Sequence, residues 1–200
     1  MPVYPGQSKP TITQTGTIKR GGYNLSSFAM GTHVGTHVDA PKHVVPDGMS
    51  IDNVPLANSI GVAVAIDLSY LEIGSGISKV DLERHDSLVN PGDIVILYTG
   101  CSDHWGEPDI ETNYTYLEKT AAEWLVAKKV KAVGIDTLGV DRYESPAPAA
   151  HKALLSNGII IIESLSNTVR NLVGKRFQLI CLPLKLRSAE AAPARVVAYE

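Results

Sequence analysis

The stretch Ile60-Gly61-Val62-Ala63-Val64-Ala65-Ile66-Asp67 is a short apolar run that ends in a carboxylate. A run of this length, bounded by polar residues and rich in valine and isoleucine, is typical of a strand that is buried on both faces. We therefore predict a buried strand over these residues. The rest of the chain is interpreted relative to this strand.

Apolar runs and helical patterns alternate from this strand to the C-terminus. Further strands are predicted over residues 93–98, 132–136, 159–163, 177–182 and 195–199. Helices are predicted from a capping box at Ser78 to about residue 86, over 115–129, and over 147–157 before Gly158. This alternation predicts an α/β fold with a mixed sheet.

Residues 1–60 have a different character, because they are rich in Gly, Pro, Thr and Ser. Short β-like stretches separated by such residues predict irregular β structure and loops. A chain of 200 residues is long enough for one domain with a sizeable core. We expect a single domain over residues 1–200.

Composition and charge exclude several classes of protein. Hydrophobic residues make up 44% of the chain and charged residues 20%, which is ordinary for a globular protein. The net charge is -3 and no basic run is present, so neither a nucleic acid nor an anionic membrane is expected as a partner. The sequence contains no run of about 18 apolar residues, so no membrane-spanning helix is expected.

Cysteine usage and the N-terminal segment bear on the cellular compartment. Cys101 and Cys181 lie in separate apolar segments and belong to no CxxC pair, so we interpret them as buried free thiols in a reducing environment. The first residues lack a basic region followed by an apolar stretch, and no signal peptide is expected. A cytoplasmic protein is the resulting expectation.

The chain carries six histidines, and three of them lie in the segment 33–43. His33, His37, Asp39 and His43 all occupy odd positions, and alternate residues of an extended chain face the same side. Imidazole and carboxylate groups are good ligands for divalent transition metals. The segment therefore predicts a metal site.

A straight strand would separate His33 from Asp39 by about 20 Å, which is too far for both to bind one ion. Two alternatives remain open: the chain bends near Gly35, or the segment serves more than one metal ion. A helix is disfavoured by Gly35, the valines, Thr36 and Pro41.

The segment 33–43 fits the pattern HxGTHxDxPxH and so resembles the signature of the metal-dependent cyclase family. That family includes bacterial kynurenine formamidase, isatin hydrolase and related amide hydrolases. Four further stretches are similar to the family's pattern, so the resemblance covers nearly the whole chain. They are Pro91–Gly100, Ala121–Asp141, His151–Glu163 and Leu182–Ala198.

The resemblance implies a metal-dependent amide hydrolase with a swivelling β/β/α fold. It implies a centre for two ions, zinc or alternatively manganese, held by His33, His37, Asp39, His151 and Glu163. By the same resemblance His43 is the catalytic proton shuttle. Asp136 and Asp141 are expected to line the site or to orient a ligand histidine, whereas His85 and His104 match no family ligand.

The expected substrate is a small amide, with an aromatic N-formyl compound such as N-formylkynurenine as the specific prediction. Hydrolysis of another cyclic amide, imide or lactone is the first alternative, and a non-catalytic metal-binding relative is the second. The resemblance also implies a homodimer or homotetramer, in which residues 1–30 are a candidate for exchange between subunits.

Three positions depart from the family's pattern near the expected substrate pocket. Tyr4 stands where the formamidases commonly carry tryptophan, Leu138 replaces a serine-like residue, and Cys101 lies where an aromatic residue often follows Thr99-Gly100. The metal motif is complete, so these departures concern the choice of substrate.

Overall fold

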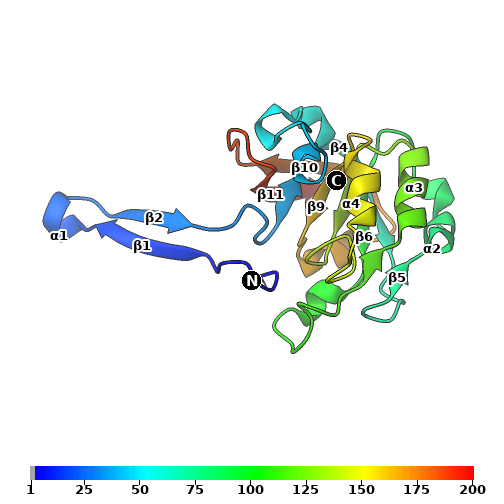
Figure 1. The fold of residues 1–200 in the computed structure, drawn as a ribbon, viewed down its shortest axis with the longest axis horizontal. Helices are drawn as coiled ribbons and strands as arrows, with labels where there is room; N and C mark the ends of the chain where they lie inside the picture. The colour runs from blue at the N-terminus through cyan, green and yellow to red at the C-terminus, as the bar shows by residue number, and fades with distance from the viewer. Residues whose placement is uncertain (1–2) are drawn as a thin grey trace.

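The computed structural model describes residues 3–200. Seven strands close into a barrel in the order β10-β11-β3-β9-β8-β6-β4. The helices α2, α3 and α4 lie together outside this barrel, and a two-stranded arm extends away from it (Figure 1). The expected mixed α/β domain is thereby confirmed.

The apolar run 60–67 forms β4 (Ile60–Asp67), which pairs in parallel with β6 (Ile94–Tyr98) and antiparallel with β10 (Arg176–Pro183). The parallel part of the sheet continues through β8 (Ala132–Ile135) to β9 (Ile160–Glu163). Two antiparallel strands complete the barrel: β11 (Ala191–Tyr199) and β3 (His37–Asp39).

The three helices that cover the barrel are α2 (Lys79–Glu83), α3 (Lys119–Ala127) and α4 (Ala149–Leu155). The predicted capping box is present: Asp81 N–H donates to the Ser78 hydroxyl, and Ser78 N–H donates to the Asp81 carboxylate. Helix α3 begins four residues later than predicted. The reason is that Tyr116–Leu117 forms a short strand, β7, beside β5 (Gly76–Ile77).

Two apolar layers hold the fold together. One lies between the helices and the outer face of the sheet and includes Val64, Leu125, Leu154 and Ile161. The other fills the barrel and includes Val38, Ile96, Ile162 and Phe177. Because neighbouring residues of a strand face opposite sides, the burial of Val38 inside the barrel directs the residues on either side of it outwards.

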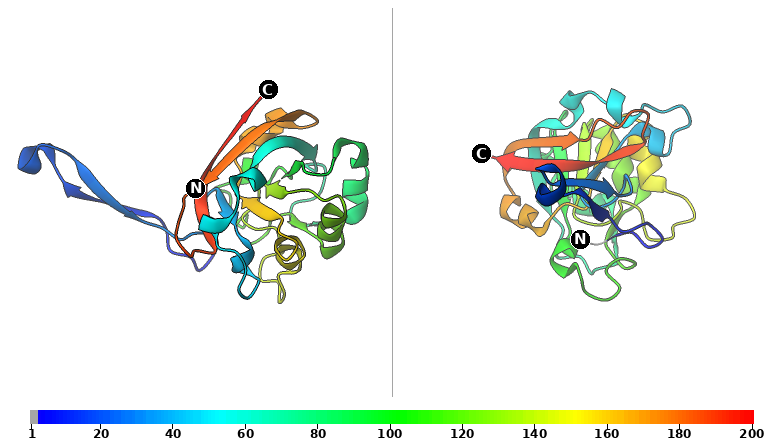
Figure 2. Two further views of the ribbon diagram at one scale, coloured as in Figure 1. Left: turned by 90° about the horizontal axis from the view of Figure 1, so that it is seen from above. Right: turned by 90° about the vertical axis from the view of Figure 1, so that its left-hand side faces the viewer.

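The N-terminal region is more regular than the sequence predicts. β1 (Thr11–Gly16) and β2 (Leu25–Ala29) form an antiparallel hairpin, joined through the short helix α1 (Ile18–Gly21). The left view of Figure 2 shows this hairpin extending far from the barrel. Its strands are exposed almost throughout, and large apolar side chains on the arm face solvent: Ile12, Ile18, Tyr23, Leu25 and Phe28.

No helix within residues 3–200 is both long and apolar enough to cross a membrane. Cys101 and Cys181 are both buried and unpaired, as expected from their apolar surroundings.

Candidate metal centre

The histidine segment turns sharply before β3, and the turn brings its first histidine back towards the strand. Gly35 has a positive φ of 68°, a conformation that glycine adopts without steric cost. Of the two alternatives left open by the spacing, a bend near Gly35 is therefore present. The expectation of one extended segment is wrong outside β3, since Pro41–His43 forms a short 3₁₀ helix.

His37 and Asp39 lie on the outer face of β3, on either side of the inward-facing Val38. In the neighbouring strand Glu163 lies directly opposite His37. Nε2 of His37 is 3.3 Å from a carboxylate oxygen of Asp39 and 3.3 Å from one of Glu163. Side-chain alternation along β3 and its register with β9 together place two carboxylates around one imidazole.

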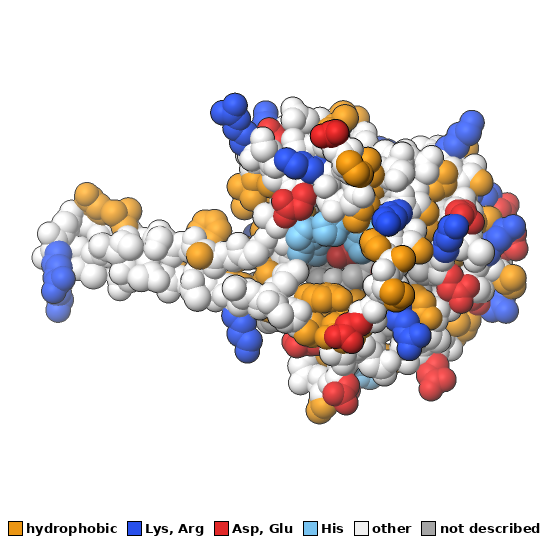
Figure 3. Space-filling model, in the orientation of Figure 1, with side chains coloured by type: hydrophobic (Ala, Val, Ile, Leu, Met, Phe, Trp, Pro, Cys, Tyr) orange, Lys and Arg blue, Asp and Glu red, His pale blue; other side chains and the backbone are white. Residues whose placement is uncertain are grey.

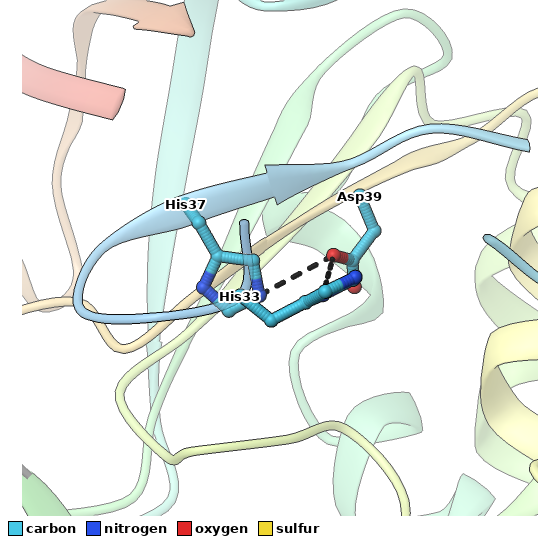
Figure 4. Close-up of side chains that lie close together, drawn as sticks. All are labelled: His33, His37 and Asp39. Atoms are coloured by element: carbon cyan, nitrogen blue, oxygen red, sulfur yellow. Dashed lines mark ion pairs between the residues drawn. The ribbon is translucent and has the colours of Figure 1, made fainter. Parts of the chain in front are cut away.

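Helix α4 supplies the next side chain from above the same face of the sheet. His151 Nε2 lies 3.4 Å from Asp39 Oδ2 and 3.3 Å from Glu163 Oε1. His33 completes the group, with its Nδ1 2.8 Å from Asp39 Oδ1 (Figure 4). The structure thus brings together all five residues that the resemblance assigned as ligands.

Several of these polar atoms are buried and lack a hydrogen bond within the described chain. They are Nε2 of His37 and both carboxylate oxygens of Asp39. The His33 nitrogen is near Asp39 but does not form a hydrogen bond of acceptable geometry with it. Buried polar atoms without partners are costly, so their convergence indicates a site for a cation.

The spacing of the donor atoms fits a transition metal. Ligand atoms about 2.0–2.1 Å from a tetrahedral zinc ion are about 3.3–3.4 Å apart. The contacts of His37 and His151 with the two carboxylates measure 3.3–3.4 Å. Two sets of donors converge closely enough for an ion, and Asp39 belongs to both: His33, His37 and Asp39, and Asp39, His43 and His151.

Hydrogen bonds on the far side of the rings leave Nε2 of two histidines free for an ion. His37 Nδ1 lies 2.8 Å from the Gly35 carbonyl oxygen, to which it can donate. His151 Nδ1 lies 2.6 Å from Asp141, whose carboxylate also accepts from the backbone N–H groups of Ala150 and His151. Partners of this kind fix the tautomer and orientation of ligand histidines.

In the metal-free protein, protonated histidine rings supply the positive charge at this site. Burial works to lower the pKa of His37, but Asp39 and Glu163 outweigh it and raise that pKa to about 10. For His151 burial is likewise outweighed, because the hydrogen bond to Asp141 and the nearby carboxylates of Asp39 and Glu163 hold its pKa well above the ordinary value. The two buried carboxylates therefore retain a positive partner, which a bound cation can replace.

His43 has a different environment from these histidines. Its ring is half-buried, with its centroid 4.3 Å from that of His33 and 5.3 Å from that of His151. Burial lowers its pKa, and the nearby Asp39 only partly opposes this effect. His43 is therefore neutral at pH 7 and can accept a proton.

The histidines lie at the bottom of a hollow on the surface of the barrel domain (Figure 3). The cavity has a volume of about 370 Å³ and is lined by His33, His43, His151 and Glu163 together with more distant residues. Leu138 and Tyr4, two of the departures noted above, line it as well, and Cys101 belongs to the same buried apolar cluster as Leu138. The departures therefore do concern the pocket.

The remaining residues singled out in the sequence lie elsewhere. Asp136 accepts hydrogen bonds from Thr99, Gly100 and Ser102 and holds the loop after β6, so its suggested role beside a ligand histidine is wrong. His104 pairs with Glu107, and neither His104 nor His85 lines the cavity.

Sequence reasoning missed Glu190 and Tyr114. Glu190 accepts a hydrogen bond from the Thr32 hydroxyl and lies 3.5 Å from Nε2 of His33. Tyr114 lines the cavity, and burial together with the Glu163 charge raises its pKa. Neither residue is part of a recognisable motif, because only the folded chain brings them near the segment 33–43.

Comparisons with known proteins agree with this geometry. Residues 1–142 match the Cyclase family model, described as "Putative cyclase". The chain is 32% identical over 204 residues to the kynurenine formamidase of Salinibacter ruber (strain DSM 13855 / M31), covering 98% of this chain and 90% of that protein.

Solved structures show the same fold. One, described as a potential metal-dependent hydrolase with cyclase activity, is 32% identical with a TM-score of 0.81, covering 99% of this chain and 90% of the other. An isatin hydrolase bound to the product analogue thioisatinate has a TM-score of 0.86 at 22% identity, and the match covers 96% of this chain and 82% of the other.

Proposed function

The chain belongs to the Cyclase family of metal-dependent hydrolases, and from that premise we propose that it hydrolyses a small aromatic N-formyl amide. The specific candidate is N-formylkynurenine, which would yield kynurenine and formate. The observation that carries the metal-dependent chemistry is Asp39, whose buried oxygens face three histidines without accepting a hydrogen bond.

His33, His37, Asp39, His151 and Glu163 would hold the metal, as two zinc ions with manganese as the alternative. Asp39 is suited to contact both ions because it belongs to both donor sets. When bound, such ions supply a Lewis acid for the amide carbonyl and lower the pKa of a water towards neutrality.

The protein's own residues would perform three tasks. His43 takes a proton from the attacking water and returns it to the leaving nitrogen, since its lowered pKa leaves the ring neutral, and so able to accept a proton, at pH 7. Asp141 holds His151 in place through Nδ1. The apolar cavity wall, which includes Tyr4, Val44 and Leu138, positions an aromatic body beside the histidines.

Assembly is part of this proposal. A two-stranded hairpin in isolation is at best marginally stable in water. On this arm 80% of the surface of Ile12 and 65% of that of Phe28 are exposed. We infer that it packs against a second copy of the chain in a homodimer, or in a homotetramer built from such dimers. A cytoplasmic location and a single domain over residues 1–200 complete the proposal.

Metal analysis of protein purified without chelator, coupled to an assay of N-formylkynurenine hydrolysis, tests the function. We expect bound zinc or manganese and turnover that chelation abolishes and metal restores. Hydrolysis of isatin or a cyclic imide in place of the formamide would favour the alternative chemistry. Metal binding without any hydrolysis would contradict the proposal.

A further inference from the structure

The wall of the active-site cavity carries one unpaired cation close to the proposed metal ligands. Among residues 3–200, Arg142 is the only lysine or arginine that lines the cavity, and it directly follows Asp141, which is hydrogen-bonded to His151. The backbone at this position is therefore tied to the site. Arg142 is exposed and lies on the cavity wall, within reach of a ligand that fills the cavity.

The guanidinium of Arg142 differs from the paired arginines of the fold. Arg176 forms two hydrogen bonds with Asp93, and Arg170 pairs with Asp103. Within residues 3–200 the Arg142 side chain makes no hydrogen bond or ion pair of this kind. Its five donors are thus available to a ligand.

Two of the three acidic groups that line the same cavity have partners within the described chain. Asp141 is hydrogen-bonded to Nδ1 of His151. Glu163 accepts a hydrogen bond from the Val140 backbone N–H and lies close to Nε2 of His151. The third, Glu144, is exposed, and desolvation together with the Glu144 carboxylate raises the pKa of Tyr143. Within residues 3–200, Arg142 is therefore the one lysine or arginine on the cavity wall, and it has no ion-pair partner there.

We propose that Arg142 binds a carboxylate on the substrate, at the end remote from the scissile amide, so that the enzyme selects anionic amides over neutral ones. This inference rests on the proposed amide hydrolysis and adds a substrate class to it. A guanidinium matches a carboxylate with two parallel hydrogen bonds, which gives orientation as well as affinity. N-formylkynurenine carries such a carboxylate, whereas isatin does not.

The test uses formanilide, which is neutral, and its 2-, 3- and 4-carboxylate derivatives, the formamidobenzoates. The ratio of kcat/KM for a carboxylated substrate to kcat/KM for formanilide isolates the contribution of the charge. For at least one isomer we expect Arg142→Met to lower this ratio about tenfold, mainly through a higher KM, because the contact is present in both ground and transition states. Arg142→Lys should retain part of the preference, since it keeps the charge but loses the planar fork.

Arg84→Met is the matched control, because it removes an arginine that pairs with Asp81 and does not line the cavity. We expect this control to preserve the ratio. A ratio that is unchanged in Arg142→Met for all three isomers overturns the inference, as does an equal fall in the control.

A second readout separates this inference from the proposed function. If the metal-loaded protein hydrolyses none of the four compounds, amide hydrolysis fails, and calorimetric binding of the formamidobenzoates then decides the role of Arg142. At least tenfold weaker binding to Arg142→Met than to the original protein supports the carboxylate contact. Equal binding, or no binding to either protein, overturns it.

Discussion

Nδ1 of His151 lies 2.6 Å from Oδ2 of Asp141, and the same carboxylate accepts the backbone N–H groups of Ala150 and His151. One side chain thereby fixes both the first turn of α4 and the orientation of the imidazole that this helix presents. The position of His151 against Asp39 and Glu163 depends on this contact, which leads to the first prediction.

Asp141→Asn should weaken metal binding about 10- to 100-fold, since an amide loses the negative charge that supports the ligand histidine. Competition with a fluorescent zinc chelator measures this change. Asp136→Asn is a comparison at a buried aspartate that holds the loop after β6, and its metal affinity should change much less. An unchanged affinity in Asp141→Asn would show that His151 needs no such support.

Asp39→Ala should reduce bound metal to less than a tenth of the original content, because it removes the carboxylate shared by both donor sets. Elemental analysis of the purified variant gives the metal content, and turnover should fall in proportion. Asp86→Ala serves as the control, since this exposed aspartate pairs with Lys128. A fully loaded, active Asp39→Ala variant would refute the site.

His43→Ala should lower kcat about 10²- to 10⁴-fold while the metal content stays close to that of the original protein. The loss reflects removal of the group that moves the proton. His104→Ala, which removes an exposed histidine paired with Glu107, should retain activity. If metal is lost with His43, this residue is a ligand, as its place beside Asp39 and His151 also permits.

The metal-free protein should lose stability as pH rises from about 6.5 to 10. The pKa of His37 is about 10 in the folded chain, above the value of about 6.5 for an unfolded chain, so its contribution is complete below pH 6.5 and disappears as pH approaches 10. The pKa of Asp39 is lowered, and its contribution is instead lost in acid. The effect is measured by thermal unfolding in EDTA across this pH range, for the original protein and for the His37→Gln variant. An equal dependence of stability on pH in both proteins would contradict the prediction.

The paired substitutions Ile12→Asp and Phe28→Asp should shift the protein towards monomers. Both side chains are exposed on paired strands of the arm, where their residues face one another in the register (Thr11↔Ala29, Ile12↔Phe28). Light scattering after size-exclusion chromatography gives the mass. Val80→Asp is the control, because it places the same charge at an exposed apolar position on α2. A monomeric original protein, or an unchanged dimer in the double variant, would exclude the arm as the interface.

The sequence by itself determined the class of the fold and the chemical type of the site. The apolar run of β4 and the capping box at Ser78 are local patterns, and local patterns act through backbone propensity and side-chain alternation, which need no distant partner. The ligand types in the segment 33–43 were also readable in this way, whereas the bend at Gly35 was one of two open alternatives until the structure showed it.

Tertiary structure alone decided how distant residues meet. His37 faces Glu163 because β3 pairs with β9 in one register, and a shift of one residue would turn that carboxylate into the barrel. His151 and Glu163 could be named from the sequence only through a family resemblance, while Glu190 and Arg142 had no local signal. Such contacts depend on the closure of the barrel and on the packing of α4 over β9, and these non-local pairings are not encoded by spacing along the chain.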